Sequence, residues 1–358
     1  MITNLLAAVT LTLAAGSAGS AGDDDTVTLR DDTIKTGKIQ AAETTGITLL
    51  VGKKPEATPW SAIASVQYGN ARDFDVARQQ IAEGKRDEGI AGLEKLAADK
   101  KLRAPLHQEV LFELARAWQA KGDADKALAT WKDLMKSHAN GRYLVSGGYW
   151  LTLALIARND PGGALRAIDE LTADARSTNA DANQVTALDL LRGRALESQK
   201  KFPDAQSACE RVAAAKEMPA DLALMAQLGA ARAVQGAGKK DDAIKRYRDL
   251  IAKRPPPLVS AGAWNGLGDI ALEAATPKKE IDGLEEALLA YLHGVVLDTP
   301  SAIEPQEELE RALAGTVKAL TLLADVETNK DRKAALVDRA ARRREEWKKQ
   351  FPTSTLLK

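Results

Sequence analysis

The sequence has almost no cysteine or histidine: its 358 residues include one Cys and three His. The single cysteine, Cys209, excludes a disulfide framework within the chain and any zinc site built from several cysteines. His107, His138 and His293 are scattered, which leaves little material for a histidine-based metal or catalytic centre. Aromatic residues make up only 4%, and much of the apolar content is alanine and leucine. This composition is typical of close-packed helices rather than of a large β-sandwich.

The chain also lacks net charge and long hydrophobic runs. Its 50 Lys and Arg residues balance 50 Asp and Glu residues, so the protein as a whole has no electrostatic attraction to a polyanion. The basic run 342–344 near the C-terminus is interpreted as the polar outer face of a capping helix. No segment approaches the ~20 apolar residues that a membrane-spanning helix needs. We therefore expect no nucleic-acid partner and no transmembrane segment.

The N-terminal residues have the order of a secretory signal peptide. Residues 4–15 are apolar, residues 16–22 are mostly small, and three aspartates follow at 23–25. No Lys or Arg precedes Arg30, so the amino terminus alone supplies positive charge to this segment. An N-terminal helix of the mature fold is the alternative. We predict a signal peptide over 1–22 and an exported bacterial protein, periplasmic or extracellular.

Residues 23–70 predict a small β-rich module. Short β-branched runs at 26–29, 33–39, 47–51 and 63–68 alternate with turn residues such as Asp31, Asp32 and Gly52. Several short strands in ~45 residues suggest an SH3-like or Sm-like barrel. A module of this size is marginally stable alone, so we expect it to pack against the helices that follow.

From residue 71 to 358 the hydrophobic period is helical and the pattern repeats. Gly84, Gly122 and Gly238 each stand between two amphipathic stretches, and the first two are 38 residues apart. In several units a small residue lies seven positions before the turn. After the turn comes an alanine, and a larger residue lies four positions after that alanine. The small residues are Ala77, Ala115, Gly193 and Ala231; the larger ones are Trp131, Ile168, Cys209, Tyr247 and Tyr291.

At these positions the chain resembles tetratricopeptide repeat (TPR) proteins, and Trp264, Leu267 and Gly268 form the W-x-x-L-G pattern of that family. The resemblance covers about 280 residues in six units and a degenerate seventh that ends at 351–352. It implies about seven stacked helical hairpins, a TPR-like α-solenoid. The spacing of 37–38 residues exceeds the 34 of the family, which predicts longer helices or loops.

The sequence contains no complete motif of a known enzyme class. The G-x-G-x-x-A run at 266–271 has no strand before it, and Gly236-Ala-Gly238-Lys239 lacks the remaining residues of a phosphate-binding loop. No H-E-x-x-H, G-x-S-x-G or cysteine–histidine pattern is present. We therefore predict no catalytic activity, no cofactor and no bound metal.

A row of arginines is the sharpest functional signal. The residue after the small packing position is arginine in four of six units, while Leu153 and Asp269 hold this place in the others. In TPR proteins this position lies on the concave surface that binds peptides. The resemblance thus implies a partner-binding groove formed by Arg78, Arg116, Arg194, Arg232, Phe112, Gln119, Tyr149 and Gln235.

Guanidinium groups bind carboxylates in bidentate fashion, so we hypothesise that the groove captures an acidic or carboxylate-terminal segment of another protein. The alternative is that these arginines pair with Asp or Glu of adjacent helices. The favoured function is a protein-binding adaptor of the cell envelope. One alternative is a structural or assembly role, in which the protein self-associates or holds an envelope complex together. Another is an enzyme with a site near Trp60 and Tyr68, between the β-module and the repeats. The sequence leaves the oligomeric state open.

Overall fold

The computed structural model describes residues 23–298, 306–351, 354 and 356. The expected signal peptide at 1–22 lies outside the described residues, as do Pro300 and Pro352 of the sixth and seventh repeat units. Within these ranges no helix is both long enough and apolar enough to cross a membrane.

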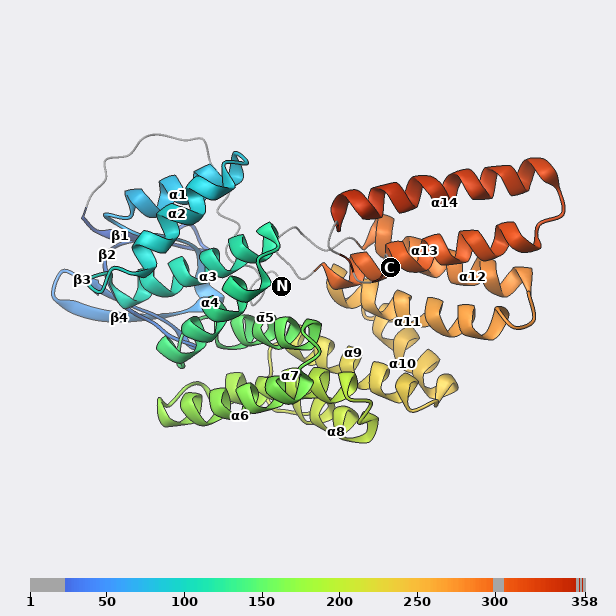
Figure 1. Cartoon of the computed structure of the whole chain (residues 1–358). Helices are drawn as coiled ribbons and strands as arrows, with labels where there is room; N and C mark the ends of the chain where they lie inside the picture. Colours follow the sequence, from blue (N-terminus) through green and yellow to red (C-terminus); the bar gives the residue numbers. More distant parts are fainter. Residues whose placement is uncertain (1–22, 299–305, 352–353, 355, 357–358) are drawn as a thin grey trace. The chain divides into compact units, whose positions relative to one another are not determined.

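A five-stranded sheet precedes fourteen α-helices in the described ranges (Figure 1). The strands are β1 (Asp25–Leu29), β2 (Ile34–Ala42), β3 (Gly46–Val51), β4 (Lys54–Pro59) and β5 (Ile63–Gln67), with the short helix η2 (Trp60–Ala62) before β5. The helices are α1 (Arg72–Ala82), α2 (Arg86–Ala97), α3 (Ala104–Lys121), α4 (Ala124–Ser137), α5 (Leu144–Ala157), α6 (Pro161–Ser177), α7 (Ala182–Ser198), α8 (Phe202–Ala213), α9 (Ala220–Gly236), α10 (Lys240–Ala252), α11 (Pro257–Ala275), α12 (Ile281–Leu292) with its π-helical extension η3 (His293–Leu297), α13 (Glu307–Val326) and α14 (Lys330–Gln350).

The sheet is antiparallel, with the strand order β4-β3-β2-β1-β5. β2 pairs with β1 along its first half and with β3 along its second half, and the pairing with β3 has a register shift between Ile39 and Ala41. Val27, Ile39 and Leu49 are buried on the inner face, as the alternating pattern predicts. β4 does not coincide with any of the predicted runs; it contains two prolines and is an edge strand, where proline is tolerated. The predicted fold class, helical-hairpin repeats preceded by a small β-module, is confirmed.

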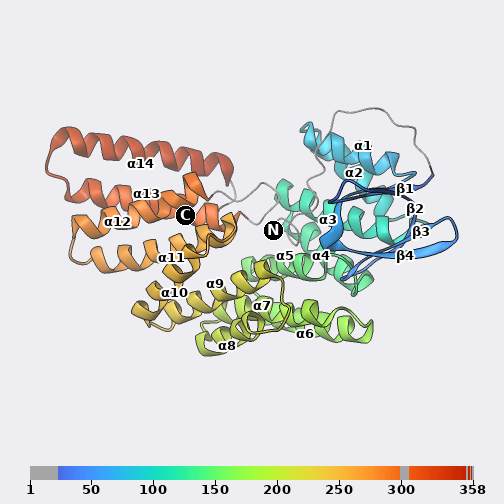
Figure 2. The same ribbon diagram turned by 180° about the vertical axis from the view of Figure 1, so that it is seen from behind.

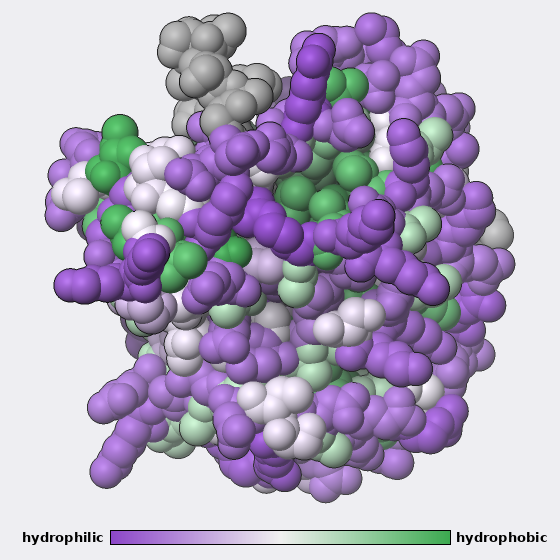
Figure 3. Space-filling view, turned by 90° about the vertical axis from the view of Figure 1, so that its left-hand side faces the viewer, coloured by the Kyte–Doolittle hydropathy of each residue, from purple (hydrophilic) through white to green (hydrophobic). Residues whose placement is uncertain are grey.

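The chain forms two compact units. Among the described residues, one unit runs from 23 to 198 and holds the sheet and α1 to α7, and the other begins at residue 199 and holds α8 to α14 (Figure 2). The side of the molecule that carries the sheet is mostly hydrophilic, with hydrophobic residues gathered in small clusters (Figure 3).

The turn glycines lie where the repeat pattern places them. Gly84, Gly122 and Gly238 have φ of 84°, 86° and 81°, a left-handed conformation that L side chains rarely adopt. Each follows the first helix of a pair and lets the chain reverse within a few residues. These three glycines therefore mark the hairpins α1–α2, α3–α4 and α9–α10.

Within the second unit, large side chains of one helix pack against glycines of the next. Gly266 leaves room for the Tyr247 ring, because a Cβ there would lie 2.3 Å from Tyr247 Cζ. Gly268 and Gly315 leave room for Tyr291 in the same way. The G-x-G-x-x-A run therefore belongs to helix–helix packing in α11. All five large residues that the repeat pattern selects are buried, and Cys209 is a core residue.

A buried carboxylate attaches the sheet to the helices of the first unit. Asp25 on β1 has no exposed surface and accepts two hydrogen bonds of 2.7 Å from Arg103, which precedes α3. It also accepts from the backbone N–H of Ile39 at 2.6 Å and of Gly69 at 2.8 Å. Its hydrogen bond and charge raise the pKa of Arg103. One side chain thus joins β1, β2, the β5–α1 connection and the start of α3.

We expect Asp25→Ala to lower the free energy of unfolding by about 3 kcal/mol, because it leaves Arg103 and two backbone N–H groups without their acceptor. Urea unfolding of the full chain measures this. Asp24→Ala is the matched control: Asp24 is exposed and lies 3.8 Å from Lys38, so its loss changes stability by less than ~0.5 kcal/mol. Equal effects of the two substitutions would contradict the role assigned to Asp25.

Candidate functional site

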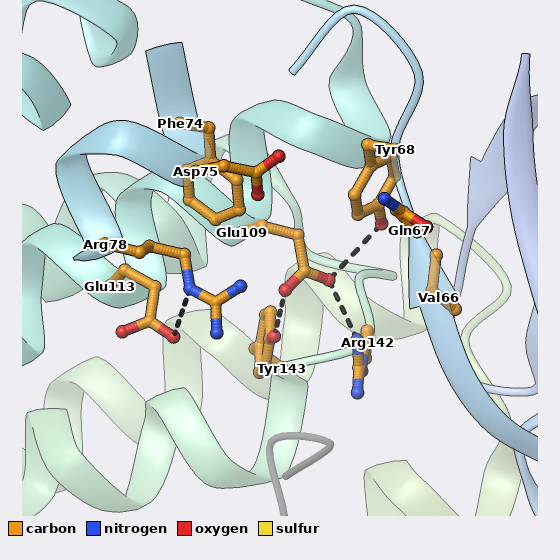
Figure 4. A pocket seen from close by; sticks show the side chains of 10 residues that line it. All are labelled: Val66, Gln67, Tyr68, Phe74, Asp75, Arg78, Glu109, Glu113, Arg142 and Tyr143. Carbon is orange, nitrogen blue, oxygen red and sulfur yellow. Dashed lines mark hydrogen bonds and ion pairs between the residues drawn. The ribbon is translucent and has the colours of Figure 1, made fainter. Parts of the chain in front are cut away.

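A small polar pocket lies in the first unit between the end of β5, helices α1 and α3, and the segment that joins α4 to α5 (Figure 4). Its volume of about 40 Å³ suits one small polar group or a few water molecules. It is lined by Val66, Gln67, Tyr68, Phe74, Asp75, Arg78, Glu109, Glu113, Arg142 and Tyr143.

Glu109 on α3 forms the centre of the pocket floor. Its carboxylate accepts hydrogen bonds from Tyr143 Oη at 2.5 Å, Arg142 at 2.9 Å and Tyr68 Oη at 3.3 Å (Figure 4). Arg142 in turn lies over the ring of Trp60, 4.4 Å from its centroid. Burial and the charge of Glu109 raise the pKa values of Tyr68 and Tyr143 well above the ordinary value of tyrosine. Both phenols therefore stay neutral and remain donors.

The pocket residues hold one another in place through hydrogen bonds. Glu109 already accepts three hydrogen bonds, so its lone pairs are engaged and it is a poor general base. The ten lining residues include no serine, cysteine or histidine that could act as a nucleophile. The pocket is also much smaller than the cavities of several hundred Å³ that hold cofactors.

Two of the predicted groove arginines meet beside the pocket. Arg78 on α1 lines it, with Nε 4.0 Å from Glu113 Oε1, and Arg116 on α3 lies 3.5 Å from Glu113 Oε2. Both side chains are partly exposed, at 31% and 23%. Glu113 therefore pairs with two arginines at once and offsets only one of their two positive charges. A partner's carboxylate has to compete with it.

Two predicted groove residues of the same unit are buried in its core. Phe112 stacks on Tyr143 at 3.9 Å between ring centroids and meets Trp131 edge-on at 5.5 Å. Phe112 and Tyr149 are only 3% and 6% exposed. Both side chains therefore belong to the core and are not exposed to a partner, in contrast to the predicted place on a binding surface. Gln119 is exposed at the end of α3, and Arg194 on α7 is paired with Glu197 at 3.1 Å.

The remaining two predicted residues belong to the second unit, where polar groups of four helices form a network. Arg232 on α9 is buried and paired with Glu308 of α13, which also accepts a 2.9 Å hydrogen bond from Asn265. Asp269 is paired with Arg311 and accepts from Tyr291 Oη at 2.6 Å. Burial and the charge of Asp269 raise the pKa of Tyr291.

Gln235 on α9, the other predicted residue of this unit, accepts a 2.6 Å hydrogen bond from Tyr247 Oη.

Comparison with known proteins supports the repeat assignment. Residues 109–141 and residues 228–291 match two family models, each described as a tetratricopeptide repeat. These ranges fall on α3–α4 and on α9–α12.

The chain contains tetratricopeptide repeats. No curated protein matches the sequence.

Several solved structures resemble the chain. TPR-like repeats from Podosopora anserina are 21% identical over 51% of this chain and 92% of their own, with a TM-score of 0.40. A tetratricopeptide repeat protein from Parabacteroides merdae is 14% identical over 75% of this chain and 98% of its own, with a TM-score of 0.44. A signal-transduction ATPase with a tetratricopeptide repeat sensor from Pyrococcus horikoshii is 12% identical over 79% of this chain and 43% of its own, with a TM-score of 0.42.

The sequence pattern did not identify most of the pocket. Glu109, Glu113 and Arg116 follow one another at i, i+4 and i+7, so the helical period alone places them on one face of the TPR helix α3. Arg142 and Tyr143 precede α5 in a connection without periodicity, and only the tertiary structure brings them to Glu109.

Two of the three histidines lie side by side near the ends of helices. His107 Nε2 lies 3.2 Å from the carbonyl oxygen of Ala97 and therefore donates to it, so His107 Nδ1 accepts from His138 Nε2 at 2.9 Å. Burial and the neighbouring His107 lower the pKa of His138 to about 4, against a smaller opposite effect of Asp133. Among the described residues no group of three or more His, Cys, Asp or Glu side chains could hold a metal ion.

This lowered pKa makes the stability of the protein depend on pH. Between about pH 6.5 and pH 4 the unfolded chain binds a proton at His138 that the folded chain does not, so stability falls as the pH falls through this window. We expect a loss of up to about 2 kcal/mol, after allowance for the partial exposure of the ring. His138→Gln removes this contribution. Urea midpoints of both proteins across the window measure it, and parallel pH profiles would contradict it.

Proposed function

We propose that the chain is a non-enzymatic adaptor, exported to the bacterial cell envelope, that binds a segment of another protein. Its TPR hairpins support this, because stacked hairpins present a surface that is ordered before binding and so reduces the entropic cost of association. The binding surface that we assign is the pocket region on α1 and α3, together with the neighbouring arginines.

The observation that carries this proposal is the cluster of partly exposed charged side chains around the pocket. The side chains of Arg78, Glu113 and Arg116 are 31%, 21% and 23% exposed, so all three charges are in contact with solvent. Charged groups held in fixed positions beside a small pocket can orient a peptide. Glu109 and its three donors keep the floor rigid beneath it.

The sign of the partner's charge is a separate part of the proposal. An acidic or carboxylate-terminal segment fits the arginines Arg78, Arg116 and Arg194, and it would have to displace Glu113 or Glu197 from them. In the second unit Arg232 already has a buried partner in Glu308. We therefore place the acidic contact at Arg116 and Arg194.

Site-specific crosslinking tests the adaptor function. A photoreactive amino acid in place of exposed Gln119 is expected to crosslink the full chain to a discrete protein in envelope extract, and the same probe in place of exposed Lys132 on α4 is not. Arg116→Glu combined with Arg194→Glu should reduce the yield about tenfold, because the reversed charges repel an acidic segment.

Lys132→Glu is the control for the change in charge. The adaptor proposal fails if Gln119 yields no crosslinked protein. If crosslinking persists but the two charge reversals leave its yield unchanged, the adaptor stands and the acidic contact at Arg116 and Arg194 is wrong.

Export has its own test. N-terminal sequencing of the protein recovered from the periplasm or the medium should begin between about residues 16 and 23, because the small residues before Asp23 suit cleavage after an apolar segment. Recovery of the protein only from the cytoplasm, with Met1 intact, would contradict the predicted location.

A further inference from the structure

Positive charge is concentrated on α14, although the chain as a whole is neutral. Nine of the 21 residues of α14 are Lys or Arg, and four are Asp or Glu. Since the whole chain has 50 residues of each kind, the rest of it carries the compensating excess of negative charge. Figure 1 shows α14 at the edge of the second unit, beside α13. An outer helix with such an excess attracts an anionic partner.

α14 packs on α13 through one narrow face. Trp347 is 5% exposed and belongs to a hydrophobic cluster with Leu313 and Val317 of α13. Leu336, three helical turns earlier, packs against a second cluster that includes Leu323 of α13. Among the residues of α14, all of which are described, Trp347 is the only buried one. The remaining sides of the helix therefore meet solvent.

The charges on these sides are only partly compensated within the helix. Three basic residues are paired with a carboxylate three or four positions away: Arg342 with Asp338, Arg343 with Glu346 and Lys348 with Glu345. The other six are exposed, and no ion pair joins them to an Asp or Glu in the described ranges: Lys330, Arg332, Lys333, Arg339, Arg344 and Lys349. The predicted basic run 342–344 is thus neutralised at its first two arginines and not at its third.

Three of these six residues lie on one side of α14 together with an exposed valine. At about 100° of rotation per residue, Lys330, Lys333, Val337 and Arg344 fall within an arc of about 60°. No Asp or Glu of α14 falls within this arc. Val337 is 54% exposed. We call these four residues the basic strip, and it extends over about 20 Å of the helix.

The composition of the basic strip favours a phospholipid surface. A bilayer with anionic lipid offers negative charge in a plane with apolar chains directly beneath, so it can accept Lys and Arg together with Val337. Phosphate contacts of a nucleic acid use the charges alone and gain nothing from an exposed valine. The one aromatic residue of α14, Trp347, is buried and cannot stack on a base.

We propose that α14 is a peripheral membrane contact, in which the basic strip lies on an anionic phospholipid surface. Its Lys and Arg side chains meet the lipid phosphates, and Val337 enters the headgroup layer between them. Because the apolar face of α14 is packed on α13, the helix lies on the bilayer and does not insert into it. This inference goes beyond the adaptor function, and the proposed envelope location brings phospholipid within reach.

Vesicle co-sedimentation of the full chain tests the inference. The probes are vesicles of phosphatidylcholine alone and mixed vesicles in which about a quarter of the lipid is anionic phosphatidylglycerol. The chain should bind the mixed vesicles about a hundredfold more tightly, and added salt should remove the difference by screening the charges. Vesicles of phosphatidylcholine alone also measure any binding by the apolar residues 4–15, which all variants share.

Substitutions in the basic strip locate the contact. Lys333→Gln combined with Arg344→Gln should weaken binding to mixed vesicles about twentyfold, since each cation near an anionic surface contributes roughly a factor of five. Val337→Thr, which keeps the shape of the side chain, should weaken it about threefold. All three residues are exposed, so the variants should keep the urea midpoint of the wild type.

The matched control removes the same charges from another helix of the second unit. Lys245 and Arg248 on α10 are exposed, and Lys245→Gln combined with Arg248→Gln should change vesicle binding by less than about twofold. Equal losses in the α10 and α14 variants would overturn the inference, as would equal binding of neutral and mixed vesicles.

A short DNA duplex provides the remaining comparison. Tighter binding of the duplex than of mixed vesicles, with no effect of Val337→Thr on either, would assign the basic strip to nucleic acid and refute the membrane contact. The adaptor function is judged separately by crosslinking at Gln119. An unchanged yield in the variant with Lys333→Gln and Arg344→Gln leaves the adaptor intact whether or not that variant binds vesicles.

Discussion

The interaction on which the first unit depends is the burial of Asp25. A carboxylate without exposed surface is tolerated only when its acceptor sites are filled, and here they are filled by the Arg103 guanidinium and two backbone N–H groups from different segments. Breaking any one of these contacts leaves the charge poorly compensated. The sheet therefore has one favourable position against α3, and the pocket at the end of β5 takes its shape from that position.

The start of α3 and the residues that follow continue this attachment. Gln108 is buried and donates to the carbonyl oxygen of Ala42 on β2 at 2.9 Å, while its own oxygen accepts from the backbone N–H of Arg142 at 3.1 Å. Glu109, the next residue, binds the side chains of Arg142, Tyr143 and Tyr68. Neighbouring polar residues on one helix thus hold the sheet on one side and the segment before α5 on the other. Because each polar group has a partner, the region is rigid as well as polar.

The sequence predicted the repeated architecture well because that architecture is local. Each repeat requires a glycine with positive φ at the turn, a small residue where two helices approach closely, and a large residue between helix pairs. These residue types therefore recur at a fixed spacing in the sequence. Gly122 and Tyr247 could both be assigned to their roles in this way. Strand β4 was not among the predicted runs because its sequence lacks the alternating β-branched pattern, and as an edge strand it tolerates its two prolines.

The candidate site was less predictable because it depends on contacts between distant segments. Arg78 and Arg116 were selected by their register in the repeat. Glu113 lies three residues before Arg116 on α3, but its contact with Arg78 could be found only once α1 and α3 were placed side by side. Phe112 and Tyr149 were selected from the same register and are buried, since a large aromatic residue near the inner surface can turn into the core instead. Register identifies a helix face, and tertiary packing decides which side chains on that face meet solvent.

The two units use the same repeat position in opposite ways, and this difference argues for where a ligand binds. In the second unit Arg232 and Asp269 occupy that position, and α13 supplies Glu308 to one and Arg311 to the other. Glu308 is almost fully buried, so the charges there are satisfied from within the chain and serve cohesion. In the first unit Arg78 and Arg116 remain partly exposed beside a pocket, and they share the single carboxylate of Glu113. A charged group that is held in place but incompletely compensated gains most from an external partner, and the described structure offers that situation at Arg78 and Arg116.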